Sequence, residues 1–247
     1  MTFTAPRGKF MIAAAGSVFL AVAMVASAWL LSRFMVKIQR ETTISAKGYA
    51  EKTVTADLGS FSAGLTVQAH DLADGYKTIS AQCATVTKML NDFGFKPDDV
   101  TVGGIEFNRV YRYVNGQETN EFLYFNLSQN IRICTGDVKR ISDNYSKLNT
   151  LLADGVQVNV TEPEYFISNP EAYKLALTAE ASKSATARAE IMAAAGGAEL
   201  KELLSARLGV IQINRPASSE MSDYGVYDTT SPEKVIKIVV ALEFSTR

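Results

Sequence analysis

The chain has 247 residues, 47% of them hydrophobic, and its 25 basic and 26 acidic side chains almost cancel. A nucleic-acid-binding protein needs a basic face to neutralise phosphates, and Lys and Arg cluster here only beside one apolar stretch, so nucleic acid is not an expected partner. One His and two widely separated Cys residues argue against a transition-metal site within one chain.

The apolar stretch runs from Phe10 to Ser32, 23 residues without a charged side chain. As an α-helix it would be roughly 34 Å long, enough to cross a hydrocarbon core of about 30 Å. We expect Phe10, Trp29 and Leu31 to contact the bilayer, with Trp29 at an interface. The predicted organisation is a cytoplasmic tail over 1–9, a transmembrane helix over 10–32, a linker over 33–42 and one folded domain over 43–247.

A cleaved signal peptide is the alternative interpretation of this stretch. Ala26-Ser27-Ala28 resembles a small-residue cleavage site, preceded by Arg7 and Lys9 as a basic segment. The run is longer than the usual apolar core of about 7–15 residues and continues beyond that site, which favours a retained anchor. The Lys and Arg residues on the two flanks do not settle the orientation, because large domains often translocate regardless of charge.

The first elements after the linker are two strands and a helix. Alternating Val, Thr and Ile within residues 44–67 predict two strands that turn near residues 49–52. Asp71 is a candidate N-cap for a helix that extends to about Phe93 and ends at Gly94. Its apolar residues recur every three or four positions, which predicts one buried face: Leu72, Tyr76, Ile79, Cys83, Val86 and Leu90.

A hairpin and a second helix follow. Two β-rich runs, 101–114 and 121–133, are joined through Asn115-Gly116-Gln117, and Asn-Gly is a strong signal for a two-residue hairpin turn. Residues 138–152 then predict a helix whose apolar face is formed by Val138, Ile141, Tyr145, Leu148 and Leu152.

The third helix has the clearest start. Asn169 suits the N-cap and Pro170 the first helical position, and the helix is expected to reach about Ala195. Short strands are expected over 156–160 and 165–168 before it and over 208–213 and 235–244 after it. The long polar loop between the last two strands, 214–231, is either a contact arm or a mobile segment. This order predicts an α+β fold, with helices packed on one face of a mainly antiparallel sheet.

The third helix also repeats alanine every fourth residue, at Ala181, Ala185, Ala189 and Ala193, which makes a narrow stripe suited to close packing. With this stripe, an ordered set of motifs resembles the SIMPL-domain family of bacterial envelope proteins over roughly residues 43–245. The motifs are the strand 43–48 ending in Gly, the helix end 90–95, the acidic step 97–101 and Asn-Pro-Glu at 169–171. The chain departs from the family pattern at Glu121-Phe122, where a Gly-Tyr pair is usual, and lacks a Pro before Asp57.

The resemblance implies a periplasmic or cell-surface location. Together with the apolar run, it leads us to expect a periplasmic domain on a single-pass anchor in a bacterial inner membrane. It also implies assembly of several copies into a ring or channel-like shell, and a suggested role in envelope stress tolerance. It supplies no catalytic residues and no cofactor.

The residues themselves offer little chemistry. No nucleophile elbow, zinc-binding helix or phosphate-binding loop is present. Asp57, His70 and Asp71 are the only candidates for a carboxylate-based hydrolase, and a single His at a helix start is more often a surface or capping residue. Cys83 and Cys134 either form a disulfide or are two separately buried thiols, and the second alternative is favoured.

We therefore expect a non-enzymatic protein whose partners are other copies of itself and the lipid bilayer; any client protein or small ligand is unknown. The hairpin aromatics are the candidate interface, since Tyr and Phe are enriched in interface cores, although they also suit cross-strand pairing and core packing. They are Tyr111, Tyr113, Phe122 and Tyr124, with Phe125 beside them. The alternative function is a monomeric periplasmic module that binds a ligand or client.

Overall fold

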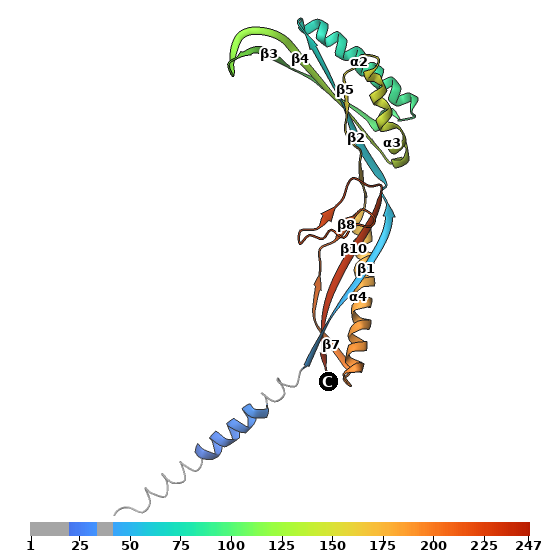
Figure 1. The fold of residues 1–247 in the computed structure, drawn as a ribbon. Helices are drawn as coiled ribbons and strands as arrows, with labels where there is room; N and C mark the ends of the chain where they lie inside the picture. The colour runs from blue at the N-terminus through green and yellow to red at the C-terminus, as the bar shows by residue number, and fades with distance from the viewer. Residues whose placement is uncertain (1–19, 34–41) are drawn as a thin grey trace, which may run out of the picture. The chain divides into compact units, whose positions relative to one another are not determined.

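The computed structural model describes residues 20–33 and 42–247 of the chain. Residues 20–33 form a helix (Figure 1). The elements that follow are β1 (Thr42–Thr55), β2 (Leu58–Ala69), α2 (Leu72–Asp92), η1 (Pro97–Asp99), β3 (Val100–Val114), β4 (Gln117–Thr135), α3 (Val138–Asn144), η2 (Tyr145–Leu152), β5 (Val158–Val160), β6 (Glu164–Phe166), α4 (Pro170–Ala195), β7 (Leu200–Leu208), β8 (Gln212–Asn214), β9 (Val226–Tyr227) and β10 (Glu233–Thr246). The α+β class is confirmed.

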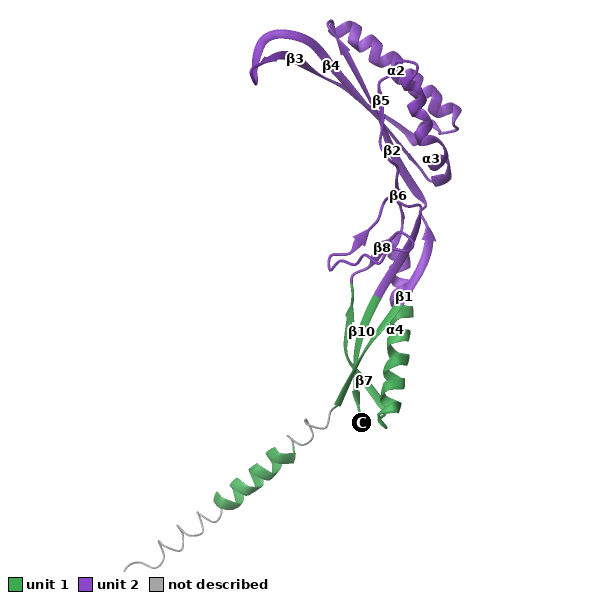
Figure 2. Ribbon diagram, viewed as in Figure 1, with its two compact units in different colours: residues 1–49, 179–209, 239–247 green, residues 50–178, 210–238 purple. Residues whose placement is uncertain are grey.

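The chain divides into two compact units (Figure 2). Unit 1 comprises residues 1–49, 179–209 and 239–247, and unit 2 comprises residues 50–178 and 210–238. Strands β1 and β10 and helix α4 each contribute residues to both units. Unit 2 contains the complete β3–β4 hairpin together with α2 and α3.

The sheet that lies wholly in unit 2 has the order β3-β4-β2-β5, and β6 also pairs with β2. All of these pairings are antiparallel. Helices α2 and α3 lie against one face of this sheet (Figure 1). The core between them is built from aliphatic and aromatic side chains of alternate strand positions and of the facing helices, including Phe61, Leu65, Ile79, Val86, Leu90, Leu127, Ile131, Ile133, Ile141 and Leu148.

A second sheet has the order β1-β10-β8-β9, and β7 pairs with β10. Strand β10 is antiparallel to β7 and β8, whereas β8 and β9 are parallel. The expectation of one sheet is therefore wrong. The alternation of apolar residues that predicts a strand is the same in either sheet, so the pattern cannot assign a strand to its neighbours.

Strands β1 and β2 do not turn at the predicted position. The first strand continues through residues 49–52 and ends at Thr55. Ala56 and Asp57 connect it to β2. The two strands then enter different sheets. Strand β7 was not predicted, and the expected strand over 208–213 is interrupted at residues 209–211.

The first predicted helix is confirmed at both ends. The Asp71 carboxylate accepts hydrogen bonds from the amides of Ala73 (2.8 Å) and Asp74 (3.1 Å), and Gly94 has a φ of +86°. The expected apolar face is wrong at one position, because Tyr76 is exposed. Its neighbour Gly75 is buried instead, in a place where any side chain would press on a core leucine of β4.

The second predicted helix changes its pitch halfway. It is α-helical over α3 and continues as the 3₁₀-helix η2. In a 3₁₀-helix, residues three apart share a face. Leu148 and Leu151 are therefore buried, whereas Leu152, the residue that the α-helical period predicts, is exposed.

The loop between β8 and β10 is held by polar side chains of the strands. Gln212 and Asn214 donate to the carbonyls of Ser222 (2.7 Å) and Glu220 (2.8 Å), and Lys237 donates to the carbonyl of Ser218 (3.2 Å). These bonds argue against a mobile segment.

Candidate interaction surface

The β3–β4 hairpin is closed by the turn that the sequence predicts. Asn115 and Gly116 have φ values of +54° and +79°, as a two-residue turn with positive φ at both positions requires. Strand β4 begins at Gln117, directly after the turn and earlier than expected. Figure 1 shows this end of the hairpin extending beyond α2 and α3.

Four aromatic rings form a continuous group on the hairpin, which we call the hairpin aromatic cluster: Phe107, Tyr111, Phe122 and Phe125. The ring centroids of Phe107 and Phe125 are 6.2 Å apart, those of Tyr111 and Phe122 are 6.2 Å apart, and those of Phe122 and Phe125 are 4.9 Å apart. Phe107 is 56% exposed and Phe122 38% exposed. The guanidinium of Arg109 lies 5.8 Å from the Phe125 ring.

The cluster continues the face of the sheet that the helices cover. Phe107 lies directly opposite Leu127, and side chains of directly opposed residues share a face. Leu127 is buried beneath α2, beside Gly75. Beyond the end of the helices the same face carries aromatic rings in contact with solvent.

Two of the predicted interface residues lie outside the cluster. The Tyr113 hydroxyl donates to the Glu118 carboxylate (2.9 Å), and this bond, together with the negative charge, raises the pKa of Tyr113. Tyr124 is opposite Val110 and makes no ring contact with the cluster. Phe107 belongs to the cluster although we did not predict it; its place four residues before Tyr111, on the same side of an alternating strand, was the available signal.

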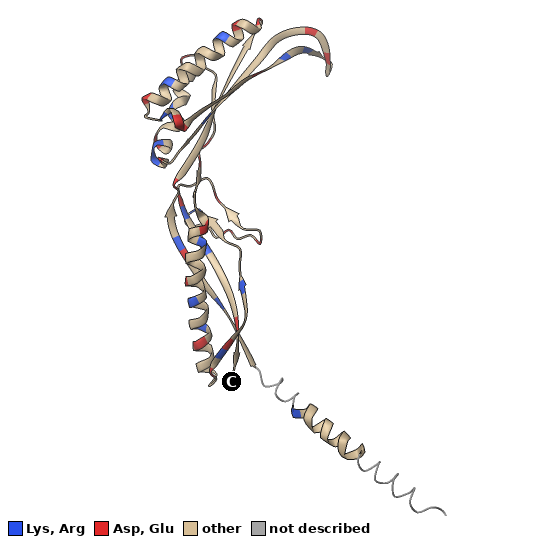
Figure 3. Ribbon diagram, turned by 180° about the vertical axis from the view of Figure 1, so that it is seen from behind, with Lys and Arg blue, Asp and Glu red and all other residues tan. Residues whose placement is uncertain are grey.

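Strand β3 also forms the edge of its sheet. Within the described part of the chain it pairs only with β4, so the backbone groups of its other edge are open to pairing. The register shifts between Val102 and Ile105, where the Gln129 side chain donates to the Gly103 carbonyl (2.9 Å). Charges of both signs lie along the hairpin (Figure 3), and Arg112 pairs with Glu121 at 3.1 Å.

The alanine stripe faces the protein's own β-strand within unit 1. Ala181, Ala185 and Ala189 are completely buried and Ala193 almost so. A methyl group at Gly48 of β1 would collide with the backbone of Ala181 and Ala185. The Arg188 guanidinium also donates to the Lys47 carbonyl (2.8 Å). These alanines therefore pack helix to strand inside one chain.

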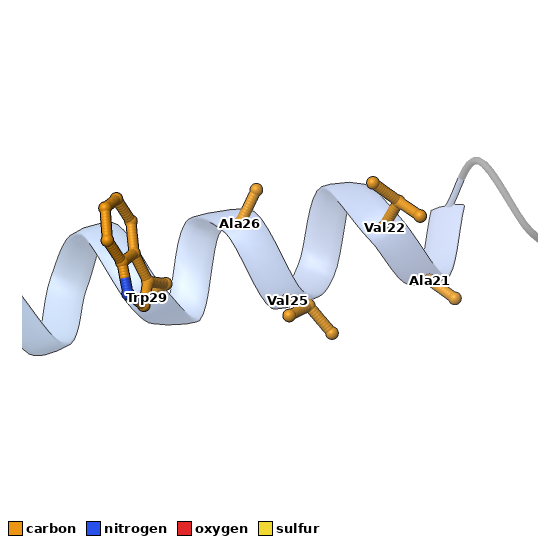
Figure 4. A pocket seen from close by; sticks show the side chains of 5 residues that line it. All are labelled: Ala21, Val22, Val25, Ala26 and Trp29. Atoms are coloured by element: carbon orange, nitrogen blue, oxygen red, sulfur yellow. The ribbon is translucent and has the colours of Figure 1, made fainter.

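The predicted membrane anchor is described only in part. Phe10 and the rest of residues 10–19 lie outside the described residues. In the helix 20–33, Trp29 and Leu31 are exposed, and Figure 4 shows Trp29 with Ala21, Val22, Val25 and Ala26 around the helix. Over residues 20–33 and 42–247, no helix combines the length and the apolar character needed to cross a membrane.

The three candidates for acid–base chemistry do not form one site. Asp71 is the N-cap of α2, and His70 precedes it on the surface. Asp57 accepts from the hydroxyl (2.6 Å) and the amide (2.7 Å) of Ser168, and these bonds lower its pKa. Asp57 therefore ties β2 to the segment before α4.

Cys83 and Cys134 are both free thiols. Cys83 is part of α2 and packs, half-buried, against the core, whereas Cys134 is exposed on β4. The thiols are separate, as favoured, but the expected burial is wrong for Cys134, because this residue lies on the face of β4 that the helices do not cover.

Residues 44–244 match the family described as SIMPL, protein of unknown function (DUF541). The chain belongs to the SIMPL family. A comparison with curated proteins finds no match. The SIMPL match covers both sheets and the hairpin aromatic cluster.

Proposed function

We propose that this SIMPL protein is a non-enzymatic, membrane-tethered envelope protein that self-assembles through its hairpin into a homo-oligomeric ring or cage. The observation that carries the proposal is the hairpin aromatic cluster, an apolar extension of a covered sheet face that is left in contact with solvent. Aromatic residues are enriched in interface cores, and exposed apolar patches of soluble proteins often mark interaction sites.

The open edge of β3 supports a second copy of the chain as the partner. An unpaired strand edge offers a row of amides and carbonyls that another strand can pair with. The edge and the aromatic rings belong to the same hairpin, so one partner can contact both. A partner seated there would cover the rings and satisfy the backbone groups.

The anchor is part of the proposal and rests on the uncharged run over 10–32. We place the domain in the periplasm, on a single helix in a bacterial inner membrane, with envelope stress tolerance as the associated role. Confinement to one membrane raises the effective concentration of the subunits, which favours assembly without any additional contact. The bilayer and other copies of the chain are thus the proposed partners.

Native mass spectrometry of the full chain, extracted from membranes in mild detergent, tests both parts. We expect one discrete species of several subunits, each retaining its first 28 residues. Replacing Phe107 and Phe122 together by Ser should shift this species to the monomer, because both rings would then be missing from the interface. The matched control is Tyr76→Ser, which removes an aromatic side chain that is 58% exposed on α2.

A monomer of the unaltered chain at micromolar concentration would contradict assembly and favour the monomeric binding module. An unchanged oligomer of the doubly substituted chain, with a native circular dichroism spectrum, would show that the hairpin is not the interface. Subunits that begin near Trp29 in the soluble cell fraction would contradict the anchor.

A further inference from the structure

Unit 2 has a cleft of about 680 Å³. Strands β2 and β4 form its floor with the side chains of Ser60, Ser62, Arg132 and Cys134. Ser60 is opposite Cys134 and Ser62 opposite Arg132 in the strand register. The alternate residues of both strands, such as Ile133, point into the core, so these four occupy the face away from α2 and α3. The volume lies within the roughly 300–1,000 Å³ typical of small-molecule sites.

Two segments form the rim of the cleft. One runs from the β5–β6 connection into the first residue of β6 and contains Thr161, Glu162, Pro163 and Glu164. The other is Thr229-Thr230 in the loop before β10. The amide of Thr161 donates to the Ser62 carbonyl (2.9 Å), and the Thr161 hydroxyl accepts from the Ser62 amide (2.9 Å). The amide of Tyr165 donates to the Thr229 carbonyl (2.8 Å), which joins the two segments.

A buried lysine holds the second segment. The ammonium of Lys234 is completely buried and donates to the carbonyls of Asp228 and Ser231, with the Asp228 carboxylate 4.0 Å away. Burial lowers the pKa of Lys234, and the charge of Asp228 opposes that shift. Burying an ammonium is costly unless its donors are satisfied. Here they are used to fix residues 228–231, so the rim is ordered before any ligand arrives.

The charged side chains of the cleft have no ion-pair partner among residues 20–33 and 42–247. Arg132, Glu162 and Glu164 form no ion pair with any described residue, whereas Arg112 and Arg140 each pair with a carboxylate. A guanidinium can form a bidentate pair with a carboxylate, and a carboxylate can form an ion pair with an ammonium. One positive and two negative groups that line one cavity without neutralising each other complement a ligand that carries both charges.

We propose that this cleft binds a short peptide with free amino and carboxyl ends. Arg132 pairs with the peptide carboxylate, Glu162 and Glu164 hold its ammonium, and the Ser60 and Ser62 side chains face its backbone. The inference does not depend on self-assembly, because none of these residues belongs to the hairpin aromatic cluster.

The free thiol on the cleft floor provides a native reporter. The probe is the dipeptide Ala-Ala, added to the full chain in mild detergent, and the readout is the rate at which a maleimide labels each thiol, resolved by peptide mass spectrometry. We expect saturating Ala-Ala to slow labelling of Cys134 at least fivefold. Labelling of Cys83, which is on α2 and packs against the core away from the cleft, should not change and serves as the internal control.

Analogues and variants identify the charges that act. N-acetyl-Ala-Ala lacks the ammonium and Ala-Ala-amide lacks the carboxylate. We expect each to bind about tenfold more weakly, a loss of about 1.4 kcal/mol, because one charge-assisted contact is missing. Arg132→Gln and the Glu162→Gln, Glu164→Gln pair should weaken Ala-Ala binding by a similar factor. Arg109→Gln, on the hairpin, is the matched control and should bind as the unaltered chain does.

Absence of protection at about 10 mM Ala-Ala would overturn the proposal. The Kd would then lie above about 10 mM, too weak for a specific peptide site. Equal protection by N-acetyl-Ala-Ala would reduce the cleft to a simple anion site and would also overturn it. Undiminished protection in Arg132→Gln would show that the peptide binds elsewhere. The oligomeric state is measured separately, so a failure here leaves the assembly test unaffected.

Discussion

Helices α2 and α4 each pack against a sheet, but by different means. Helix α2 buries large side chains, with Ile79, Val86 and Leu90 all fully covered. Helix α4 buries alanines at four-residue spacing, directly over Gly48 of β1. The first helix is held by the apolar volume that it removes from water, and the second by the closeness of its backbone to the strand.

The difference predicts opposite responses to side-chain size. Where packing depends on volume, removing atoms leaves a cavity. Where it depends on close approach, adding a single methyl group forces the helix and strand apart. Two substitutions test this contrast and a third tests how the start of α4 is held; they follow in order of decreasing expected effect.

Leu90→Ala should lower the free energy of unfolding by about 2–5 kcal/mol, because it removes a completely buried side chain from the α2 core. Denaturant unfolding of the full chain measures the loss. Tyr76→Ala on the same helix is the control and should change the free energy by no more than about 0.5 kcal/mol, since this side chain is exposed. Equal losses would mean that α2 is not held by buried volume.

Gly48→Ala should cost about 1–3 kcal/mol, since the new methyl group would meet the backbone of Ala181 and Ala185 rather than a flexible side chain. Amide hydrogen exchange should show the loss of protection in α4. Gly64→Ala in β2 is the matched control, because the nearest atom to its methyl group is the Asn159 carbonyl oxygen at 3.8 Å, an ordinary contact. A neutral effect at position 48 would contradict the close approach.

Asp57→Asn should have the smallest effect, about 1 kcal/mol or less near pH 7, because the carboxylate is exposed and solvent weakens its two bonds to Ser168. The bonds lower the pKa of Asp57 in the folded protein below 3.8, so their contribution is complete above about pH 4 and is lost as the pH falls through the folded pKa. The variant should therefore lose less stability than the unaltered chain on acidification.

Thermal unfolding between pH 2.5 and 7 measures this dependence, with Asp98→Asn in η1 as the control. The comparison also separates the two helix starts. Helix α2 begins with the cap Asp71 and α4 with the cap Asn169, whose side-chain oxygen accepts from the Ala172 amide (3.3 Å). The start of α4 has a further tie, from Ser168 to Asp57, 111 residues earlier in the chain. If the Asp57→Asn chain has the same pH profile as the unaltered chain, the hydrogen bonds between Asp57 and Ser168 do not stabilise the fold.

The turn and two of the aromatic residues of the candidate interaction surface were predictable from the sequence, but the full set of rings in contact was not. The Asn115-Gly116 turn and the aromatic character of Tyr111 and Phe122 follow from local sequence signals. The register shifts in β3 decide which rings meet, and they depend on the pairing with β4. At the shift between Val110 and Tyr111, Tyr111 pairs with Phe122, whose ring meets that of Phe125.

The cleft could not be predicted at all. Its residues come from β2, β4, the β5–β6 connection and the loop before β10, which are far apart in the chain. Neither Arg132 nor Lys234 lies in a recognisable motif. Their roles depend on which side chains the tertiary structure leaves unpaired and which it buries.

The amino-acid sequence by itself determined the α+β class, the ends of α2 and α4, the hairpin turn and the alanine stripe. Each of these depends on caps, turn residues and periodicity, which act between residues a few positions apart. Tertiary structure alone decided that there are two sheets, that β1 and β2 belong to different ones, and which aromatic rings stay exposed. Strand partners lie far apart in the chain, and an alternating pattern fits any neighbour, so only packing selects among them.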